Sequence, residues 1–517
     1  MTAWPRWRRK FPPGPSVVEQ AEAVAFLTAQ APELVQTHIS MVFLGPDVAY
    51  KLKRAVRLPY LDYSTLARRK MFCDAELEMN RRTAPEIYRR VRAITRAADG
   101  GLEWDGAGAP VEYVLEMARF AQEDLFDTLA QSHRLTPRLI RDLADAVWDF
   151  HRNAAPVPGG GAAALRDVAA GNAVELSACC PPLAPDAVAT LNSATAAVLD
   201  AQAALLDARA AAGLVRRCHG DLHLRNIVLW QGEPRLFDGI EFSDDFACID
   251  VLYDLAFLLM DLLHRGEYGF AALLFNRYFD RGSGSDGLRA MPLFISLRAA
   301  IRAHVSVAQG KVAEAALYLA LAQAALAPAP PRLCAIGGFS GTGKSTLAGL
   351  LAPALPPMPG ARVIRSDVLR KRLAGLAPET KLPAGAYTRE ASAKVYEEML
   401  REAEAALGAG YSVILDAAFL RAEERGAAEA LAARLDVPFI GFWLQAPENI
   451  LSRRLDARRG DASDADTSVL RQQAGFMTGA VTWRRLDAAL STEVLACAAR
   501  RAIFSQPAVQ RHNPPPG

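Results

Sequence analysis

The chain has 517 residues, of which 51% are hydrophobic and 22% are charged, and its formal net charge at pH 7 is +2. A chain of this length is too long for one ordinary hydrophobic core, so two or three domains are expected. The balanced charge argues against a nucleic-acid coat or a carrier of polyanions, although it allows a local charged patch.

Cysteine usage and apolar runs indicate the compartment. The seven cysteines are odd in number and lack metal-ligand spacing, which favours free thiols in a reducing compartment. No apolar run approaches the roughly 18 residues that a membrane helix requires. We therefore expect a cytoplasmic protein without a membrane partner. The sequence leaves its oligomeric state open.

Composition also suggests the domain boundaries. Proline-rich segments mark a linker and a tail, and the motifs on the two sides of the linker differ in kind. The predicted organisation is an N-terminal extension (1–29), a first domain (30–326), a linker (327–331), a second domain (332–505) and a disordered tail (506–517).

The first domain starts with a predicted hairpin. Residues 41–44 and 48–52 are apolar strands that flank a Gly-Pro-Asp turn. The second strand contains Val48-Ala49-Tyr50-Lys51, which resembles the V-A-I-K strand whose lysine contacts nucleotide phosphates in kinases. Alternation places Lys53 on the same face of the strand, so Lys51 is the favoured phosphate ligand and Lys53 is its rival.

A helix is predicted over residues 65–82, where the kinase pattern requires a glutamate that pairs with the strand lysine. Glu76 and Glu78 both satisfy this requirement. No glycine-rich G-x-G-x-x-G loop precedes Lys51, and Thr37-His38-Ile39-Ser40 occupies the place of the phosphate-covering turn.

The next elements predict a small sheet lobe followed by helices. Residues 111–117 form an apolar strand that leads into a hinge at 118–120, where backbone groups would bind adenine. Helices are then predicted over 137–151, beginning at a proline, and over 186–212, ending before Gly213.

The segment 218–241 carries the chemistry of the first domain. Asp221 is followed five residues later by Asn226 and twelve after that by Asp238, the spacing of a kinase catalytic loop and its metal-binding aspartate. Phosphoryl transfer needs one carboxylate for the acceptor hydroxyl, and an amide with a second carboxylate for magnesium. Apolar runs between these residues predict a hairpin that would bring the three side chains together.

These motifs also carry a family resemblance. His219-Gly220-Asp221, Asn226 and Asp238-Gly239-Ile240-Glu241 resemble the aminoglycoside phosphotransferase group of the kinase-like superfamily. The resemblance implies an α+β protein-kinase-like bilobal fold with Asp221 as the catalytic residue and Glu76 as the partner of the strand lysine. It further implies that Asp250 and Asp254 fix the catalytic loop by hydrogen bonds. These two acids could instead meet a cationic acceptor.

The second domain begins with a phosphate-loop signature. A short apolar strand at 333–336 precedes Gly338-Phe339-Ser340-Gly341-Thr342-Gly343-Lys344-Ser345 and a helix, which is the complete G-x-x-x-x-G-K-S motif in its strand-to-helix setting. It predicts an α/β P-loop NTPase domain with a parallel sheet, in which Lys344 reaches the outer phosphates and Ser345 ligates magnesium. The predicted nucleotide-binding residues are Gly338, Ser340, Gly341, Thr342, Gly343, Lys344, Ser345 and Thr346.

Further polar residues follow predicted strands and helices of the second domain. Asp367 and Arg370 form a D-x-x-R pattern that resembles polynucleotide kinases and other small P-loop kinases, whose aspartate is the base for the acceptor hydroxyl. A helix cap is the alternative role for Asp367. Asp416 ends the next strand and is a candidate to hold magnesium through water. Arg454 and Arg458 lie before a polar loop and are predicted lid arginines, against an ordinary exposed charge.

The order of the motifs resembles uncharacterised bacterial proteins that fuse an aminoglycoside-phosphotransferase-like domain to a P-loop kinase-like domain. The predicted function is a bifunctional ATP-dependent phosphotransferase with ATP and Mg²⁺ as cofactors. The acceptor would be a small-molecule hydroxyl in the first domain, and a small molecule or a nucleic-acid end in the second. Two alternatives stay open: one domain is a nucleotide-sensing module for the other, or the P-loop domain is an ATPase.

Overall fold

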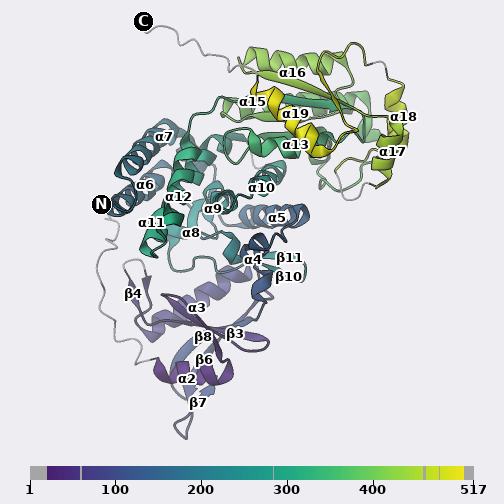
Figure 1. The fold of residues 1–517 in the computed structure, drawn as a ribbon. Helices are drawn as coiled ribbons and strands as arrows, with labels where there is room; N and C mark the ends of the chain where they lie inside the picture. Colours follow the sequence, from purple (N-terminus) through teal and green to yellow (C-terminus); the bar gives the residue numbers. More distant parts are fainter. Residues whose placement is uncertain (1–19, 59–60, 283–284, 458–461, 477, 506–517) are drawn as a thin grey trace. The chain divides into compact units, whose positions relative to one another are not determined.

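The computed structural model describes residues 20–58, 61–282, 285–457, 462–476 and 478–505. The chain divides into two compact units (Figure 1). Unit 1 comprises the residues up to Asp261 together with Leu297–Ala322, and unit 2 comprises Leu262–Ser296 and the residues from Gln323 onward. Among the described helices, none combines the length and the apolar character needed to cross a membrane.

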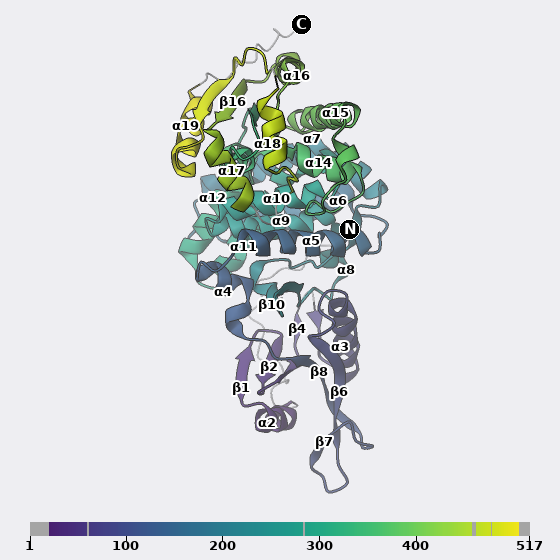
Figure 2. The ribbon, with the colours of Figure 1, turned by 90° about the vertical axis from the view of Figure 1, so that its right-hand side faces the viewer.

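Unit 1 begins with a six-stranded antiparallel sheet in the order β1-β2-β3-β8-β6-β7. Helix α3 packs along β8 and β6 (Figure 2). The predicted hairpin is confirmed, because β2 and β3 pair antiparallel with Leu44 opposite Ala49. The elements are α2 (Ala21–Gln30), β1 (Glu33–Gln36), β2 (Ser40–Leu44), β3 (Val48–Lys53), β4 (Arg57–Leu58), β5 (Leu61–Asp62), α3 (Leu66–Arg81), β6 (Tyr88–Arg96), β7 (Leu102–Trp104) and β8 (Pro110–Ala118).

Helix α2 belongs to the core of this sheet. Its Ala23 and Leu27 are buried against Phe43 and Leu52 of the first strands. The predicted N-terminal extension over 1–29 therefore does not match the packing, since residues from α2 onward are part of the sheet lobe. Helical periodicity over residues 16–29 predicts a helix here, but it does not show that the apolar face of this helix is covered.

The rest of unit 1 is mostly helical. Its polar motifs lie on two short pairs of strands and on a 3-10 turn. Thr136 caps α5 by accepting from Leu139 N at 3.3 Å, and Gly213 follows α7 with φ +72°, as the proline and glycine positions predicted. The elements are η1 (Gln122–Asp124), α4 (Phe126–Gln131), α5 (Pro137–Asn153), α6 (Gly161–Ala178), α7 (Pro185–Ala211), β9 (Val215–Arg217), η2 (Leu224–Asn226), β10 (Ile227–Trp230), β11 (Glu233–Leu236), α8 (Asp244–Ala247), β12 (Cys248–Asp250), α9 (Val251–His264), α11 (Met291–Ala308) and α12 (Val312–Leu326).

Unit 2 is built on a five-stranded parallel sheet in the order β14-β15-β13-β16-β17, with the phosphate-loop strand β13 at its centre. This is the α/β class that the motif predicted. The elements are α10 (Tyr268–Asp280), η3 (Ser285–Ala290), β13 (Leu333–Gly338), α13 (Lys344–Leu351), η4 (Ala352–Ala354), β14 (Arg362–Arg365), α14 (Ser366–Leu373), η5 (Ala384–Tyr387), α15 (Arg389–Gly408), β15 (Val413–Asp416), α16 (Ala422–Arg434), β16 (Phe439–Gln445), α17 (Glu448–Ala457), α18 (Thr467–Ala474), β17 (Arg484–Asp487) and α19 (Thr492–Phe504).

Helix α10 is fastened to strand β14 by a buried polar network. The side chain of Asn276 accepts from Val363 N at 2.7 Å and from Arg362 at 2.9 Å, and it donates to Ala361 O at 3.0 Å. Arg362 also pairs with Asp280 at 2.6 Å. The packing thus places 262–296 with the P-loop sheet, although the sequence analysis had assigned these residues to the first domain.

Asn276→Ala is expected to destabilise unit 2 by about 1–3 kcal/mol, because it leaves buried backbone and guanidinium groups without partners. The measurement is the midpoint of thermal unfolding of the full chain, followed together with hydrogen exchange in β14. The control is Asn449→Ala, which removes an exposed asparagine of the same unit. Equal exchange rates in β14 for the two variants would contradict the anchoring role of Asn276.

Candidate functional site

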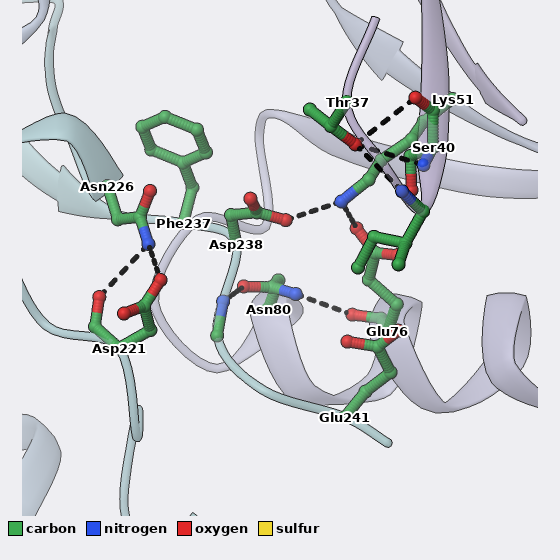
Figure 3. Close-up of polar contacts among 12 residues, drawn as sticks. Thr37, Ser40, Lys51, Glu76, Asn80, Asp221, Asn226, Phe237, Asp238 and Glu241 are labelled. Carbon is green, nitrogen blue, oxygen red and sulfur yellow. Dashed lines mark hydrogen bonds and ion pairs between the residues drawn. The ribbon is translucent and has the colours of Figure 1, made fainter. Parts of the chain in front are cut away.

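The catalytic-loop residues of unit 1 converge as their spacing predicted. Asn226 donates from Nδ2 to the carboxylate and to the backbone carbonyl of Asp221, both at 3.0 Å (Figure 3). Phe237 N donates to Asn226 O at 3.0 Å, so the β10–β11 hairpin returns the chain beside Asn226 just before Asp238. Two carboxylates and an amide, from Asp221, Asp238 and Asn226, therefore lie in one region (Figure 3).

Asp254 accepts hydrogen bonds from the backbone of the segment just before Asp221. Its two carboxylate oxygens accept from His219 N at 3.0 Å and from Gly220 N at 2.9 Å, and His151 Nε2 lies 3.1 Å away. Burial would raise the pKa of Asp254, but the hydrogen bond from His151 and the neighbouring cations lower it below the ordinary value. Asp254 thus has the role that the family resemblance implied, and its complete burial excludes contact with an acceptor.

Of two other acids nearby, Asp261 adds to this support, whereas Asp250, which was predicted to fix the loop, does not. Asp250 does not contact the loop: it pairs with Arg209 through two bonds of 2.7 Å and so ties β12 to α7. Asp261 instead accepts from Leu224 N at 3.0 Å, a contact that sequence reasoning missed. Asp261 belongs to an apolar helix, and the presence of an acid in an apolar segment was the only sign in the sequence that this residue has a structural role.

The carboxylate of Asp221 is suited to receive a hydroxyl. His223 Nε2 lies 3.4 Å from its Oδ2. Desolvation raises the pKa of Asp221, but the charge of His223 and its hydrogen bond outweigh this and bring the pKa below the ordinary range. Asp221 is therefore ionised at neutral pH, as a group that orients a hydroxyl must be.

Lys51 connects the sheet to the segment that carries Asp238. Its Nζ lies 2.7 Å from Glu76 Oε1 and forms a second ion pair with Asp238 (Figure 3). Glu76 is fully buried; burial opposes its ionisation, yet Lys51 and Lys53 lower its pKa to about 2. Glu78 is exposed, so Glu76 is the partner that the helix supplies.

Sequence reasoning missed the residues that shape the Asp238 segment. Asp238 has φ +61°, and its backbone N–H donates to the hydroxyl of Tyr88 at 3.0 Å. Gly239 N donates to Asn80 Oδ1 at 2.9 Å. Asn80 follows Glu76 by one helical turn, and this i, i+4 spacing was the signal that could have found it. Thr37 Oγ1 accepts from Ser40 N at 3.0 Å and closes the turn where a phosphate-covering loop was expected.

The phosphate loop of unit 2 requires its glycines. Gly341 has φ +84°, and a Cβ there would lie 2.9 Å from the carbonyl oxygen of Leu451. Lys344 Nζ donates to the carbonyls of Gly338 and Phe339 at 2.9 and 3.0 Å, across the loop. The loop opens into a cavity of about 710 Å³. Of the predicted residues, those lining it are Ser340, Gly341, Thr342, Gly343, Lys344, Ser345, Thr346, Asp367, Asp416 and Arg454.

The acids of this cavity differ in environment. Asp416 is buried, accepts a hydrogen bond from Ser345 and lies 3.3 Å from Arg365; burial raises its pKa against these groups. A hydroxyl beside a carboxylate is an oxygen donor set that fits Mg²⁺, as do Asn226 and Asp238 in unit 1. Asp367 lies in the first turn of α14, which has no side-chain cap, so the alternative role as a helix cap is not observed.

Two lid contacts were not predicted from the sequence. Gln473 of α18 accepts from Ser340 N of the phosphate loop at 2.8 Å. Asp464 accepts from Lys371 and Leu382 N at 3.0 Å and from the hydroxyl of Tyr387 at 2.7 Å. The predicted lid arginine Arg454 lines the cavity, whereas Arg458 lies outside the described residues.

Comparison with known proteins agrees with both sets of motifs. Residues 73–293 match the model of the phosphotransferase enzyme family, and residues 333–479 match an AAA domain model. Uncharacterized proteins of Mycobacterium tuberculosis and Mycobacterium bovis are 29% identical over 469 residues, which are 88% of this chain and 92% of theirs. The chain is thus similar to a phosphotransferase enzyme family over 73–293 and to an AAA domain family over 333–479, in the order of the two groups of motifs.

Solved structures are similar to one part of the chain or the other. A choline/ethanolamine kinase family protein of Mesorhizobium loti is 16% identical with a TM-score of 0.37, covering 60% of this chain and 95% of that protein. The APS kinase of Mycobacterium tuberculosis is 21% identical with a TM-score of 0.26, covering 34% of this chain and 100% of that protein.

Asp254→Asn is expected to loosen the catalytic loop, because an amide can no longer accept from both His219 N and Gly220 N. Breaking this buried contact should cost about 1–3 kcal/mol. The measurement is hydrogen exchange of residues 218–226 in the full chain, with thermal unfolding in parallel. Asp200→Asn, at an exposed aspartate of α7, is the control. Unchanged exchange in the loop would show that Asp254 does not hold it.

Proposed function

We propose that this phosphotransferase enzyme is bifunctional and moves the terminal phosphoryl group of MgATP to a hydroxyl acceptor at two separate sites. The observation that supports this proposal most is the repetition of one chemical arrangement in the two units. Each unit brings together carboxylates, further side-chain oxygens and a lysine, which would serve the acceptor hydroxyl, Mg²⁺ and the phosphates.

In unit 1, Asp221 would accept the hydrogen bond and then the proton of the acceptor hydroxyl. Asn226 and Asp238 would hold Mg²⁺, which neutralises charge on the phosphates when bound. Lys51 would contact phosphate oxygens while Glu76 fixes its direction. Since Asp221 is already held by Asn226, little reorganisation would be needed before the hydroxyl arrives.

In unit 2, the backbone N–H groups of the phosphate loop and Lys344 would surround the phosphates. Ser345 and Asp416 would supply oxygen donors to Mg²⁺, Asp416 through water. Asp367 lines the same cavity and would receive the proton of the acceptor, while Arg454 would stabilise the transferring group from the lid. The lid segment would also exclude water, which limits hydrolysis of ATP.

The acceptors are proposed only by class. A cavity of about 710 Å³ has the size of small-molecule sites in proteins. We therefore favour a small-molecule hydroxyl acceptor in unit 2, with a nucleic-acid end as the alternative, and we propose the same class of acceptor for unit 1. The net charge of +2 gives no support to an extended nucleic-acid interface.

The full chain is expected to bind two equivalents of a non-hydrolysable ATP analogue in the presence of Mg²⁺. Lys344→Ala should remove the binding in unit 2, and Asp238→Ala should weaken that in unit 1, so the combined variant should retain only the weakened binding of unit 1. The measurement is isothermal titration calorimetry. A stoichiometry of one for the folded wild-type chain would contradict the proposal of two nucleotide sites.

Asp221→Asn and Asp367→Asn are expected to lower phosphoryl transfer in their own unit by about 10²–10⁴-fold while preserving ATP binding, because each removes a proton acceptor. The measurement is transfer from labelled ATP to fractionated metabolite pools. The exposed residues Asp200 and Asp436, each changed to Asn, are the controls for the two units. A nucleotide sensor would bind ATP without transfer from the wild-type chain, and an ATPase would release phosphate without an acceptor.

A further inference from the structure

Lys51 and Lys53, the two candidate phosphate ligands, both form ion pairs with carboxylates, and their sets of partners differ. Lys51 and Lys53 lie on the same face of β3, two residues apart. Glu76 bridges them, with Oε1 at 2.7 Å from Lys51 Nζ and Oε2 at 2.7 Å from Lys53 Nζ. One buried carboxylate therefore serves two lysines, an arrangement that the family resemblance did not suggest.

Lys53 is buried and its donors are fully used. Only 1% of its surface is exposed, and its Nζ contacts Glu241 at 2.5 Å and the hydroxyl of Tyr63 at 3.3 Å in addition to Glu76. Tyr63 in turn donates to Glu241 at 2.7 Å. An ammonium group has three N–H donors, so Lys53 has none left for a phosphate. Lys51 is the more accessible of the two and the only one that contacts Asp238 among the described residues.

Asp238 and Glu241, the two acids of one motif, pair with different lysines. The Asp238 carboxylate points toward Lys51 (Figure 3). The Glu241 carboxylate instead contacts Lys53 and the hydroxyl of Tyr63. The segment between the two acids is fixed to the sheet lobe by Tyr88 and Asn80, as described above. Glu241 therefore fixes the other end of this segment. Because the segment is fixed at both ends, the Asp238 side chain keeps one orientation.

We propose that Lys53 and Glu241 are positioning residues that hold the metal-binding segment and Glu76 in place, so that Lys51 can exchange Asp238 for the phosphates of the nucleotide. The inference rests on the function proposed for unit 1. When Asp238 binds Mg²⁺, its ion pair with Lys51 must be given up. Glu76 then keeps one lysine on each oxygen, and Glu241 keeps its partner throughout. Neither buried acid is left as an unpaired charge.

The two lysines should therefore have separable effects on nucleotide binding. Each variant is made in the full chain carrying Lys344→Ala, so that ATP binding reports unit 1 alone. The measurements are the affinity for ATP in EDTA, the Mg²⁺ concentration at half-saturation of ATP binding, and the thermal unfolding midpoint. Lys51→Met is expected to weaken ATP binding with and without Mg²⁺, since it removes a phosphate contact.

Glu241→Gln and Lys53→Met are expected to leave metal-free ATP affinity within about twofold of the parent, and to raise the half-saturating Mg²⁺ concentration about 10–100-fold, the usual effect of removing a group that orients a metal ligand. Their combination should be no worse than the worse single variant, since both break one contact. Lys70→Met, at an exposed lysine of α3 that pairs with Asp74, is the control and should change neither quantity.

A smaller change keeps the test decisive if Lys53→Met does not fold. Tyr63→Phe removes only the hydroxyl that donates to Glu241, and it should raise the half-saturating Mg²⁺ concentration about two- to fivefold with little change in unfolding midpoint. A folded Glu241→Gln with the parental Mg²⁺ requirement would overturn the inference, as would loss of metal-free ATP binding in Lys53→Met. No ATP binding by the Lys344→Ala parent would instead refute the function proposed for unit 1.

Discussion

A charge removed from water must be matched by partners, and the site of unit 1 depends on this constraint. Glu76, Asp254 and Lys53 are almost completely buried, and each is surrounded by donors or acceptors from segments distant in the sequence. Breaking one of these pairs leaves an uncompensated charge, which costs far more than losing an exposed ion pair. The buried pairs therefore define one arrangement of the sheet, the helix α3 and the catalytic loop.

Sequence reasoning was most successful where function and local structure share a short segment. The phosphate loop was predicted completely, because its glycines, lysine and serine are contiguous and its strand-to-helix setting is visible in the hydrophobic pattern. The convergence of Asp221, Asn226 and Asp238 also followed from spacing, since one hairpin joins them. The elements predicted over 41–44, 48–52, 65–82, 111–117, 137–151 and 186–212 lie within two residues of the observed ones, whereas others, such as β6 and α6, were not predicted.

The contacts that could not be predicted join residues far apart in the chain. Nothing in the sequence shows that Lys53 meets Glu241, which follows it by 188 positions, or that Asp250 turns to Arg209. The packing of α10 was missed for the same reason: its helical pattern is clear, but a polar face that satisfies strand β14 looks like an ordinary exposed face. Gln473 is likewise an unremarkable helix residue until its contact with Ser340 is known.

The two sites also solve the same electrostatic problem by different means. In unit 2, phosphate charge would meet backbone N–H groups whose direction is fixed by glycine conformations, so few side chains need support. In unit 1, the turn at Thr37–Ser40 is not rich in glycine, so side-chain charges would have to bind the phosphates instead. Because side chains have rotational freedom that a backbone lacks, they require a surrounding network to hold them. This explains why the buried ionic cluster is extensive around Lys51, while the phosphate loop relies mainly on its own backbone between β13 and α13.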